Sequence, residues 1–261
     1  MGQITSISNE RVRRAQALLR SARRRMREGL IVLEGLRLVR EAWMAGSPIA
    51  ELFFTAEFAA EARGAALVKG IDQAGASLWE VPPQVLVALS DTETPQGVVA
   101  VVSAPTPVQA PSGGLILIPD QVRDPGNLGT ILRAAWAAGV WKVLLPPGTV
   151  DPLSPKVLRA AMGAHFYLPI LRLSWEEIGH ELIGRTVWLA EAGQGTSYDA
   201  VDWSGPVALI VGGEAEGAGA EARALAAGHH VCIPMALGVE SLNAAVATAV
   251  LLFEAARQRR E

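Results

Sequence analysis

The chain is poor in cysteine and shows neither a long apolar run nor, in its first residues, the pattern of a secretory signal. Its 261 residues include one cysteine, Cys232, which excludes an internal disulfide bond and a cysteine-rich metal site. No stretch approaches the roughly 20 uninterrupted apolar residues of a membrane span. The first residues, MGQITSISNERVRR, lack the apolar middle of a signal peptide. We therefore expect a cytoplasmic protein without a metal, in which Cys232 is a small core residue.

Acidic residues are scarce in the first forty positions. This segment has ten arginines and three glutamates, a net charge of +7, whereas the whole chain carries −3 and the remainder therefore −10. A basic segment in an acidic protein favours binding to a polyanion, because neutralising phosphates releases condensed counterions. A solvated helix face is the alternative. The run RVRRAQALLRSARRRMREG has few acids at helical spacing to neutralise its arginines, which favours the polyanion.

Apolar strands alternate with helices in two blocks. After one basic helix, LIVLEG, IAELFFT and GVVAVVS predict strands of a small α/β domain over residues 1–105. The Pro- and Gly-rich stretch APTPVQAPSGG is typical of a linker. In the second block, residues 106–261, the strands LILIP, KVLLP, TVWLAEA, VALIVGG and HHVCIPM are almost continuously apolar. Such strands predict a parallel sheet covered by helices on both faces.

The last helix has too much apolar surface for a solvent-facing helix. Its sequence, SLNAAVATAVLLFEAARQRR, is apolar around most of the circumference until a basic final turn. We expect it to be largely buried. A two-fold interface with a second copy would cover it, and packing against the rest of its own chain is the alternative.

Polar residues interrupt an aliphatic segment at the first strand-to-helix turn of the second block. The sequence DPGNLGTILRAA carries Asn127 and Arg133 just after the strand LILIP. Ligands bind at the carboxyl ends of parallel strands, where loop amides and helix N-termini converge. The two side chains are therefore candidates for ligand contacts. Alternatively, Asn127 caps the helix and Arg133 pairs with a surface acid.

Two further strand ends repeat this design. LIVGGEAEGAG ends a strand in a glycine pair, and glycines let backbone amides approach a ligand closely. In IPMALGVESLNAAVA, Ser241 is placed to cap the last helix, with Leu242 and Asn243 in its opening turn. Three such turns predict one shared pocket. The G-x-G-x-x-G fingerprint of dinucleotide-binding folds does not occur in the required order, which disfavours a nucleotide-dependent metabolic enzyme.

The three turns together resemble a known family. NLGTILRAA, LIVGGEAEG and IPMALGVESLNAAVATA are similar, in order and spacing, to the signature motifs of the SpoU (TrmH-like) branch of the SPOUT RNA methyltransferases. RRRMREGLIVLEGLRLVREA and TPQGVVAVV resemble the family's N-terminal substrate-binding domain. The resemblance implies an α/β fold: an L30e-like domain, then a SPOUT catalytic domain with a parallel sheet and a C-terminal trefoil knot. It also implies a homodimer formed through the catalytic domain.

The implied activity is transfer of a methyl group from S-adenosylmethionine to a ribose 2′-hydroxyl of RNA. The two-domain layout favours ribosomal RNA. A transfer-RNA methyltransferase and a non-catalytic RNA-binding or ribosome-assembly protein of the same fold are the alternatives. Arginine is a poor general base because its guanidinium stays protonated at neutral pH. It is suited to clamping a phosphate and stabilising a developing alkoxide.

Site residues are carried over from the family position by position. The implied catalytic residues are Asn127, Arg133, Glu214, Ser241 and Asn243. The implied cofactor-binding residues are Ala190, Glu191, Ala192, Gly193, Gly212, Gly213, Glu214, Gly217, Ile233, Pro234, Met235, Ser241 and Leu242. Either Gly212 or Gly213 touches the cofactor. The RNA-binding candidates come instead from the basic first forty residues, and they are Arg11, Arg13, Arg14, Arg23, Arg24, Arg25 and Arg37.

Overall fold

Two compact units make up the molecule. The computed structural model describes residues 1–92, 94–106, 113–213 and 217–260. One unit comprises Met1–Thr106 with Leu153–Phe166, and the other comprises Pro107–Pro152 with Tyr167–Glu261. The middle of the expected linker, residues 107–112, lies outside the described residues. The segment Leu153–Phe166 belongs to the first unit although it follows the linker in sequence.

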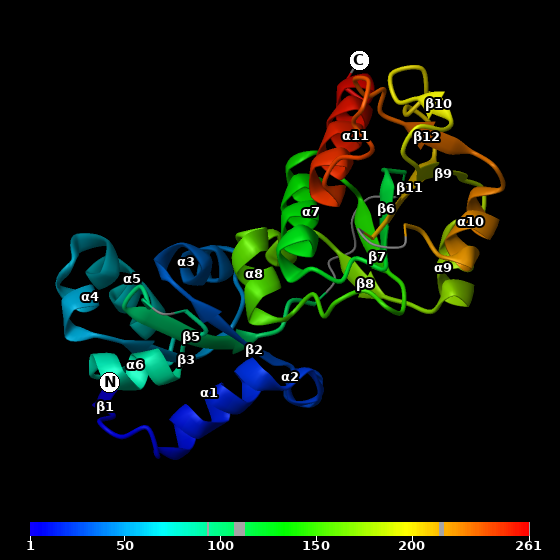
Figure 1. Ribbon diagram of the computed structural model, residues 1–261. Helices are drawn as coiled ribbons and strands as arrows, with labels where there is room; N and C mark the ends of the chain where they lie inside the picture. The colour runs from blue at the N-terminus through cyan, green and yellow to red at the C-terminus, as the bar shows by residue number, and fades with distance from the viewer. Residues whose placement is uncertain (93, 107–112, 214–216, 261) are drawn as a thin grey trace. The chain divides into compact units, whose positions relative to one another are not determined.

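The first unit contains a five-stranded mixed sheet. Its strands are β1 (Gly2–Gln3), β2 (Leu30–Glu34), β3 (Ile49–Phe54), β4 (Ser77–Glu80) and β5 (Val98–Ser103), in the spatial order β1-β4-β3-β5-β2 (Figure 1). Strands β1, β4 and β3 are parallel, whereas β5 runs antiparallel to both of its neighbours. Successive side chains of a strand point to opposite faces, so each strand contributes to two cores.

Helices cover both faces of this sheet. They are α1 (Glu10–Arg20), α2 (Ala22–Glu28), α3 (Leu36–Met44), α4 (Ala56–Ala60), α5 (Ala62–Gln73), α6 (Pro83–Ala88), α8 (Pro155–Ala161) and a 3-10 turn, Ala164–Phe166. On one face, Phe54 packs in a cluster with Leu67 of α5 and Leu158 of α8. On the other, Phe53 packs with Leu18 of α1 and Leu86 of α6. The small α/β domain is thus a three-layer structure.

The basic segment forms two helices where one was expected. Ser21 has an extended backbone (φ −126°, ψ 107°), and its N–H donates to Ala17 O, closing α1. Its hydroxyl then accepts a hydrogen bond from Arg24 N at 3.2 Å as the N-cap of α2. The prediction was wrong because a serine hydroxyl satisfies a first-turn amide and so starts a new helix.

A seven-stranded parallel sheet forms the second unit. Its strands are β6 (Ile116–Asp120), β7 (Lys142–Leu145), β8 (Ile170–Arg172), β9 (Thr186–Ala190), β10 (Thr196–Ser197), β11 (Val207–Gly212) and β12 (His230–Cys232). Their order is β10-β12-β9-β11-β6-β7-β8, and every pairing is parallel. The predicted parallel sheet is confirmed. Its carboxyl ends meet at one edge, which places the three motif turns there.

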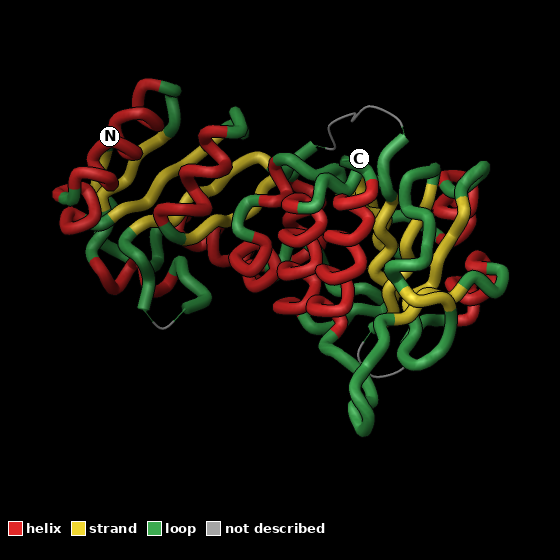
Figure 2. Tube along the Cα trace, turned by 90° about the horizontal axis from the view of Figure 1, so that it is seen from above, coloured by secondary structure: helices red, strands yellow, loops and turns green. Residues whose placement is uncertain are grey.

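Helices flank this sheet on both sides. Helices α7 (Pro125–Ala137) and α11 (Ala244–Gln258) lie side by side on one face, and α9 (Trp175–Glu181) and α10 (Ala220–Ala226) lie on the other (Figures 1 and 2). Ile118 and Ile210 of the sheet share a cluster with Ile178 of α9 and Ala222 of α10. The trefoil knot stays a prediction.

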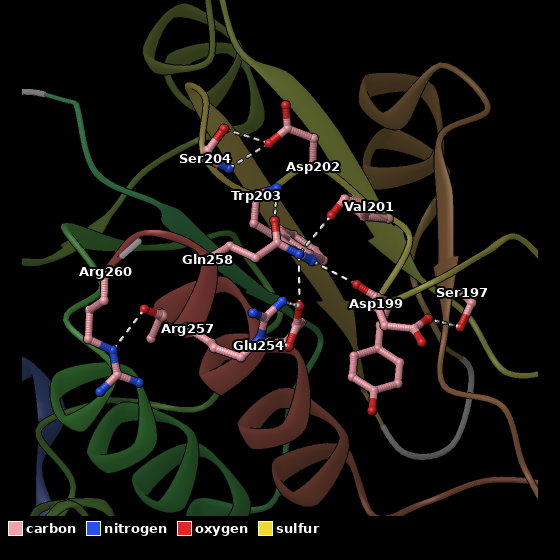
Figure 3. Close-up of polar contacts among 12 residues, drawn as sticks. Ser197, Asp199, Val201, Asp202, Trp203, Ser204, Glu254, Arg257, Gln258 and Arg260 are labelled. Atoms are coloured by element: carbon pink, nitrogen blue, oxygen red, sulfur yellow. Dashed lines mark hydrogen bonds and ion pairs between the residues drawn. The ribbon is translucent and has the colours of Figure 1, made fainter.

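Most of α11 is buried or half-buried, as expected. Leu251 and Leu252 are buried, and the exposed residues of the helix are Val246 (50%), Phe253 (48%) and Arg257. Its C-terminal end is fixed by Gln258, whose Oε1 accepts from Trp203 N at 2.9 Å and whose Nε2 donates to Val201 O at 3.0 Å (Figure 3). Trp203 is fully buried and anchors this loop.

Two smaller expectations concern Cys232 and membrane spans. Cys232 is half-buried and lies 3.5 Å from Gly195 O, so its assignment to the core was wrong. It ends the short strand β12, where the chain turns toward solvent. Within the described parts of the chain, no helix combines the length and apolar character that crossing a bilayer requires.

Candidate functional site

A cavity of about 760 Å3 opens at the strand ends of the second unit. Strands β9, β11 and β12 are parallel neighbours, so their carboxyl ends open into the same space. The cavity is lined by Ala190, Glu191, Ala192, Gln194, Val211, Gly212, Gly213, Gly217, Ala218, Arg223, Val231, Ile233, Met235, Ser241, Leu242, Asn243, Ala244, Ala247 and Leu251. Apolar walls with a few polar groups are typical of small-molecule sites.

Most of the implied cofactor residues lie in this lining. They are Ala190, Glu191, Ala192, Gly212, Gly213, Gly217, Ile233, Met235, Ser241 and Leu242. Gly193 and Pro234 belong to the same loops but are not part of the lining. Glu214 lies outside the described residues. The second and third motifs, about twenty residues apart in sequence, thus share one cavity because parallel strands bring their ends together.

The glycine pair at the end of β11 is packed against backbone. A Cβ on Gly213 would collide with the carbonyl oxygen of Gln121, and a Cβ on Gly212 would stand 2.5 Å from Ala218 N. Gln121 itself has a positive φ of 54°. Both glycines line the cavity, and both are required by the close approach of neighbouring turns.

A buried carboxylate supports this glycine turn. Asp120, the last residue of β6, is 1% exposed, and its Oδ2 accepts a hydrogen bond from Gly219 N at 2.7 Å. Burial raises the pKa of Asp120, and the bond from Gly219 opposes that rise. Sequence reasoning did not single out Asp120. The signal was available, since an acid that directly follows LILIP ends a buried strand beside a predicted ligand turn.

The first and third motifs touch through two asparagines. Asn243 Nδ2 donates to Asn127 Oδ1 at 3.0 Å. Asp124 caps α7 by accepting from Asn127 N at 2.8 Å, so the capping alternative for Asn127 was wrong. Asn243 also caps α11, in place of Ser241, by accepting from Ala245 N and Val246 N. All three motifs therefore meet at one edge of the sheet.

Arg133 stands apart from this cluster. It is exposed on α7, six residues after Asn127, which places the two side chains about 120° apart around the helix axis. The residues that line the cavity do not include it. Among the residues that the structure describes, no acid forms an ion pair with Arg133, which leaves the surface-pair alternative without a partner.

A charged cluster crosses one wall of the cavity. Arg223 of α10 pairs with Glu191, which follows β9, through Nη1 and Oε1. The other carboxylate oxygen, Oε2, lies 2.8 Å from Nδ1 of His230 on β12. Glu191 N donates to Val231 O at 3.0 Å, which fixes the backbone beneath the carboxylate. No spacing rule marks Arg223 within AEARALA, so the sequence did not identify it.

Several RNA-binding candidates of the first unit are engaged in the fold. Arg25 is 5% exposed and donates through Nη1 to Leu18 O at 2.6 Å, so it satisfies the end of α1 and is not available to RNA. Arg11 pairs with Glu51 and lies 4.6 Å from the centre of a Trp79 ring. Glu28 forms ion pairs with two more of the candidates, Arg14 and Arg24. The hydrogen bond from Arg24 contributes most to lowering the pKa of Glu28.

A concave surface between α1 and α2 gathers other arginines. We call it the arginine groove, and it is lined by Arg13, Gln16, Ala17, Arg20, Ser21, Arg23, Arg24 and Arg27. Arg20 and Arg27 were not among the candidates, and the candidates Arg11, Arg14, Arg25 and Arg37 lie outside the groove. Within the described part of the chain, Arg13, Arg20 and Arg23 form no ion pair.

Known proteins resemble the whole chain. Residues 114–253 match the SpoU rRNA Methylase family, and residues 9–100 match the MRM3-like substrate binding domain. The chain belongs to the SpoU rRNA methylase family. It is 34% identical to mitochondrial rRNA methyltransferase 3 of Mus musculus, over 97% of this chain and 73% of that protein. It is 33% identical to the 23S rRNA (guanosine(2553)-2'-O)-methyltransferase RlmP of Bacillus subtilis, over 97% of this chain and 98% of that protein.

A solved structure extends the likeness to the fold. The AdoMet-bound rRNA methyltransferase from Sinorhizobium meliloti matches with a TM-score of 0.84 and 32% identity, covering 98% of this chain and 97% of that one. The predicted membership of the SpoU family and the α/β fold class are confirmed. The cavity also fits AdoMet (S-adenosylmethionine) by its own chemistry. Its volume falls in the range of about 300–1,000 Å3 usual for such sites, and it offers apolar walls, open strand-end backbone and both signs of charge.

Proposed function

We propose that the protein transfers a methyl group from S-adenosylmethionine to a ribose 2′-hydroxyl of ribosomal RNA. The observation that carries this proposal is the shared cavity, lined by the second and third motifs and joined to the first by the contact between Asn127 and Asn243. The likeness to RlmP, named as a 2'-O-methyltransferase of 23S rRNA, supports the acceptor. The likeness to the AdoMet-bound S. meliloti structure supports the cofactor.

The acceptor oxygen has to be positioned and deprotonated before it can attack the methyl group. A ribose hydroxyl has a pKa far above neutrality, so it is a poor nucleophile until its proton is lost. The bound cofactor supplies a methyl group that the sulfonium already activates. The chain therefore has to place the oxygen in line and assist deprotonation. Arg133 is permanently charged, and in this proposal it grips the adjoining phosphate and stabilises the developing alkoxide.

The asparagines and the serine have positioning roles in this proposal. Asn243 caps α11 and donates to Asn127, so the two amides hold the first and third motif turns in one arrangement. Ser241 and Leu242 line the cavity just before that cap. Glu214, the remaining implied catalytic residue, lies outside the described residues.

RNA binding falls to the first unit. The arginine groove combines five guanidinium groups with a concave surface, and three of them, Arg13, Arg20 and Arg23, have no acidic partner within the described chain. Phosphodiester backbones bind such surfaces because each neutralised phosphate releases counterions. The match of residues 9–100 to a substrate binding domain supports this division of labour.

A homodimer through the catalytic unit completes the proposal. Val246 and Phe253 of α11 are about half exposed, and a two-fold contact would bury these apolar side chains. Light scattering at micromolar concentration should report twice the chain mass. Phe253→Glu should give monomers, since a carboxylate cannot be buried there unpaired. A monomeric wild-type protein would contradict the dimer.

The activity is tested with labelled cofactor and RNA. Purified protein, S-adenosylmethionine with a labelled methyl group, and ribosomal RNA should give labelled RNA in which the phosphodiester bond after the modified nucleotide resists alkali. Transfer RNA and a ribosomal RNA fragment with 2′-deoxyribose at the modified position serve as controls. Label in transfer RNA alone would move the substrate to that class. RNA binding without any label would favour the non-catalytic alternative.

A further inference from the structure

The charged cluster in the cavity wall joins two segments that line the cavity. Glu191 belongs to the loop after β9, and Arg223 reaches from α10 toward the glycine turn after β11. A Cβ added to Gly217 would lie 3.8 Å from Arg223 Nη2, so the guanidinium lies directly over that turn. In the described lining, Glu191 and Arg223 supply the charges of opposite sign.

This pair is poorly suited to a purely structural role. The Arg223 side chain is 48% exposed and that of Glu191 is 19% exposed, and ion pairs that reach water contribute little net stability because solvent screens them. Glu191 already has a second neighbour in His230. Its backbone is fixed by Val231 whether or not Arg223 is present. The pair can therefore open at small cost.

S-adenosylmethionine ends in an α-amino and an α-carboxylate group. We infer that Glu191 binds the ammonium and Arg223 the carboxylate of this amino-acid end, each exchanging its partner in the ion pair for the matching charge of the ligand. Carboxylate recognition suits arginine because a guanidinium donates two parallel hydrogen bonds. The apolar walls and strand-end backbone then hold the adenosyl end. This inference deepens the proposed function and rests on its cofactor.

Ligands that differ at the amino-acid end separate this role from a structural one. Calorimetry would compare S-adenosylhomocysteine, which keeps both charges, with 5′-methylthioadenosine, which lacks them, on the full chain without RNA. The wild-type protein should bind the former at least about tenfold more tightly, the order expected for charge-assisted hydrogen bonds. Arg223→Met should remove most of that difference and leave the affinity for 5′-methylthioadenosine within about twofold.

A charge swap distinguishes recognition from loop fastening. The double variant Glu191→Arg with Arg223→Glu keeps an ion pair across the same wall but reverses its polarity. If the pair only fastens the two loops, the swap restores wild-type binding of both ligands, and the inference is overturned. If Glu191 binds the ammonium and Arg223 the carboxylate, the swapped variant should still bind S-adenosylhomocysteine weakly and 5′-methylthioadenosine with normal affinity.

A second ion pair in the same unit provides the matched control. Arg172 and Asp151 have side-chain exposures of 52% and 20%, close to those of Arg223 and Glu191, and both lie outside the cavity lining. Arg172→Met should leave both affinities unchanged. Equal weakening of both ligands by Arg223→Met would assign a structural role to the pair and overturn the inference. Failure of every adenosyl ligand to bind the wild-type protein would instead overturn the cofactor assignment.

Discussion

The cavity of the second unit and the arginine groove of the first unit differ in what forms them: mainly backbone in the cavity and side chains in the groove. The cavity of the second unit is formed by strand ends, glycines and small residues whose backbone is fixed by the sheet. The arginine groove of the first unit is formed by long side chains on two short helices. A backbone site depends on the positions of turns in the chain, whereas a side-chain site depends on which way each helix faces. The first is therefore readable from motif spacing, and the second is not.

The largest effect is expected at Arg133, which lines neither the cavity nor the arginine groove. Arg133→Ala should reduce turnover at least about 100-fold, the order expected when an electrostatic contact to the transition state is removed. Thermal stability and S-adenosylmethionine affinity should stay near wild type, since Arg133 is exposed and lies outside the cavity lining. Methyl transfer to ribosomal RNA, calorimetry and thermal melting measure the three quantities.

The lysine variant refines that result. Arg133→Lys keeps the charge but not the planar fork that grips a phosphate through two bonds, so rescue should be poor. A variant that unfolds would return Arg133 to a structural role. Normal methylation by Arg133→Ala would remove it from the catalytic machinery and leave the cavity as the whole site.

The glycine pair tests how far the cavity depends on backbone. Gly213→Ala should lower the affinity for S-adenosylmethionine by more than about tenfold and the melting temperature by several degrees, because its Cβ would strike the carbonyl of Gln121 and displace the turn. Gly205→Ala is the control, since no atom lies within 4 Å of its Cβ. Normal binding by Gly213→Ala would show that the turn can move without harming the site.

The groove is tested by reversing charge inside and outside it. Arg13→Glu with Arg20→Glu should lower RNA affinity about tenfold at moderate salt and reduce the slope of log affinity against log salt by about two. Cofactor affinity should not change. The control, Arg63→Glu with Lys69→Glu, alters net charge equally at exposed positions outside the groove. Equal losses in both variants would mean that RNA responds to overall charge and not to the groove.

What the sequence could predict follows the same division. The parallel sheet was readable because buried strands are continuously apolar, and the three turns at strand ends predicted one shared pocket. Its individual lining residues, such as Gly212, Ile233 and Leu242, came from the family resemblance. The break between α1 and α2 at Ser21 was not readable from the sequence, since a serine inside a helical pattern either faces solvent or caps a new helix. That break decides which arginines share the groove, so Arg20 and Arg27 were not among the RNA-binding candidates, whereas the candidate Arg25 is buried.

Contacts between distant segments were also beyond sequence reasoning. Asp120 meets Gly219 almost one hundred positions later, and Glu191 meets Arg223 32 positions later. Neither partner has a spacing that identifies the other. The short strands β4, β8 and β10 were not expected because their sequences are too short for a clear alternation of apolar and polar residues. Tertiary pairing, which the sequence does not display locally, creates them.

The smallest expected effect concerns one acidic residue in each unit. Arg24 and then Arg14 lower the pKa of Glu28 in the first unit, and Arg257, followed by Gln258, lowers the pKa of Glu254 in the second unit to about 2. A carboxylate with a lowered pKa stabilises the fold above its ordinary pKa of 4.5 and loses that contribution as the pH falls. The contribution of Glu254 should therefore be complete at neutral pH and disappear between pH 4.5 and about 2.

Glu254→Gln should thus lower the melting temperature slightly at pH 7 and converge with the wild type near pH 2. The effect is small because Arg257, whose side chain is 53% exposed, opens the ion pair to solvent, which screens it. Circular dichroism melts from pH 7 to pH 2 measure it, with Glu176→Gln, an exposed glutamate of α9, as control. If the units melt separately, Glu254→Gln should shift the transition of the second unit, and Glu28→Gln that of the first. An acid profile of Glu254→Gln identical to that of the wild type would contradict the lowered pKa.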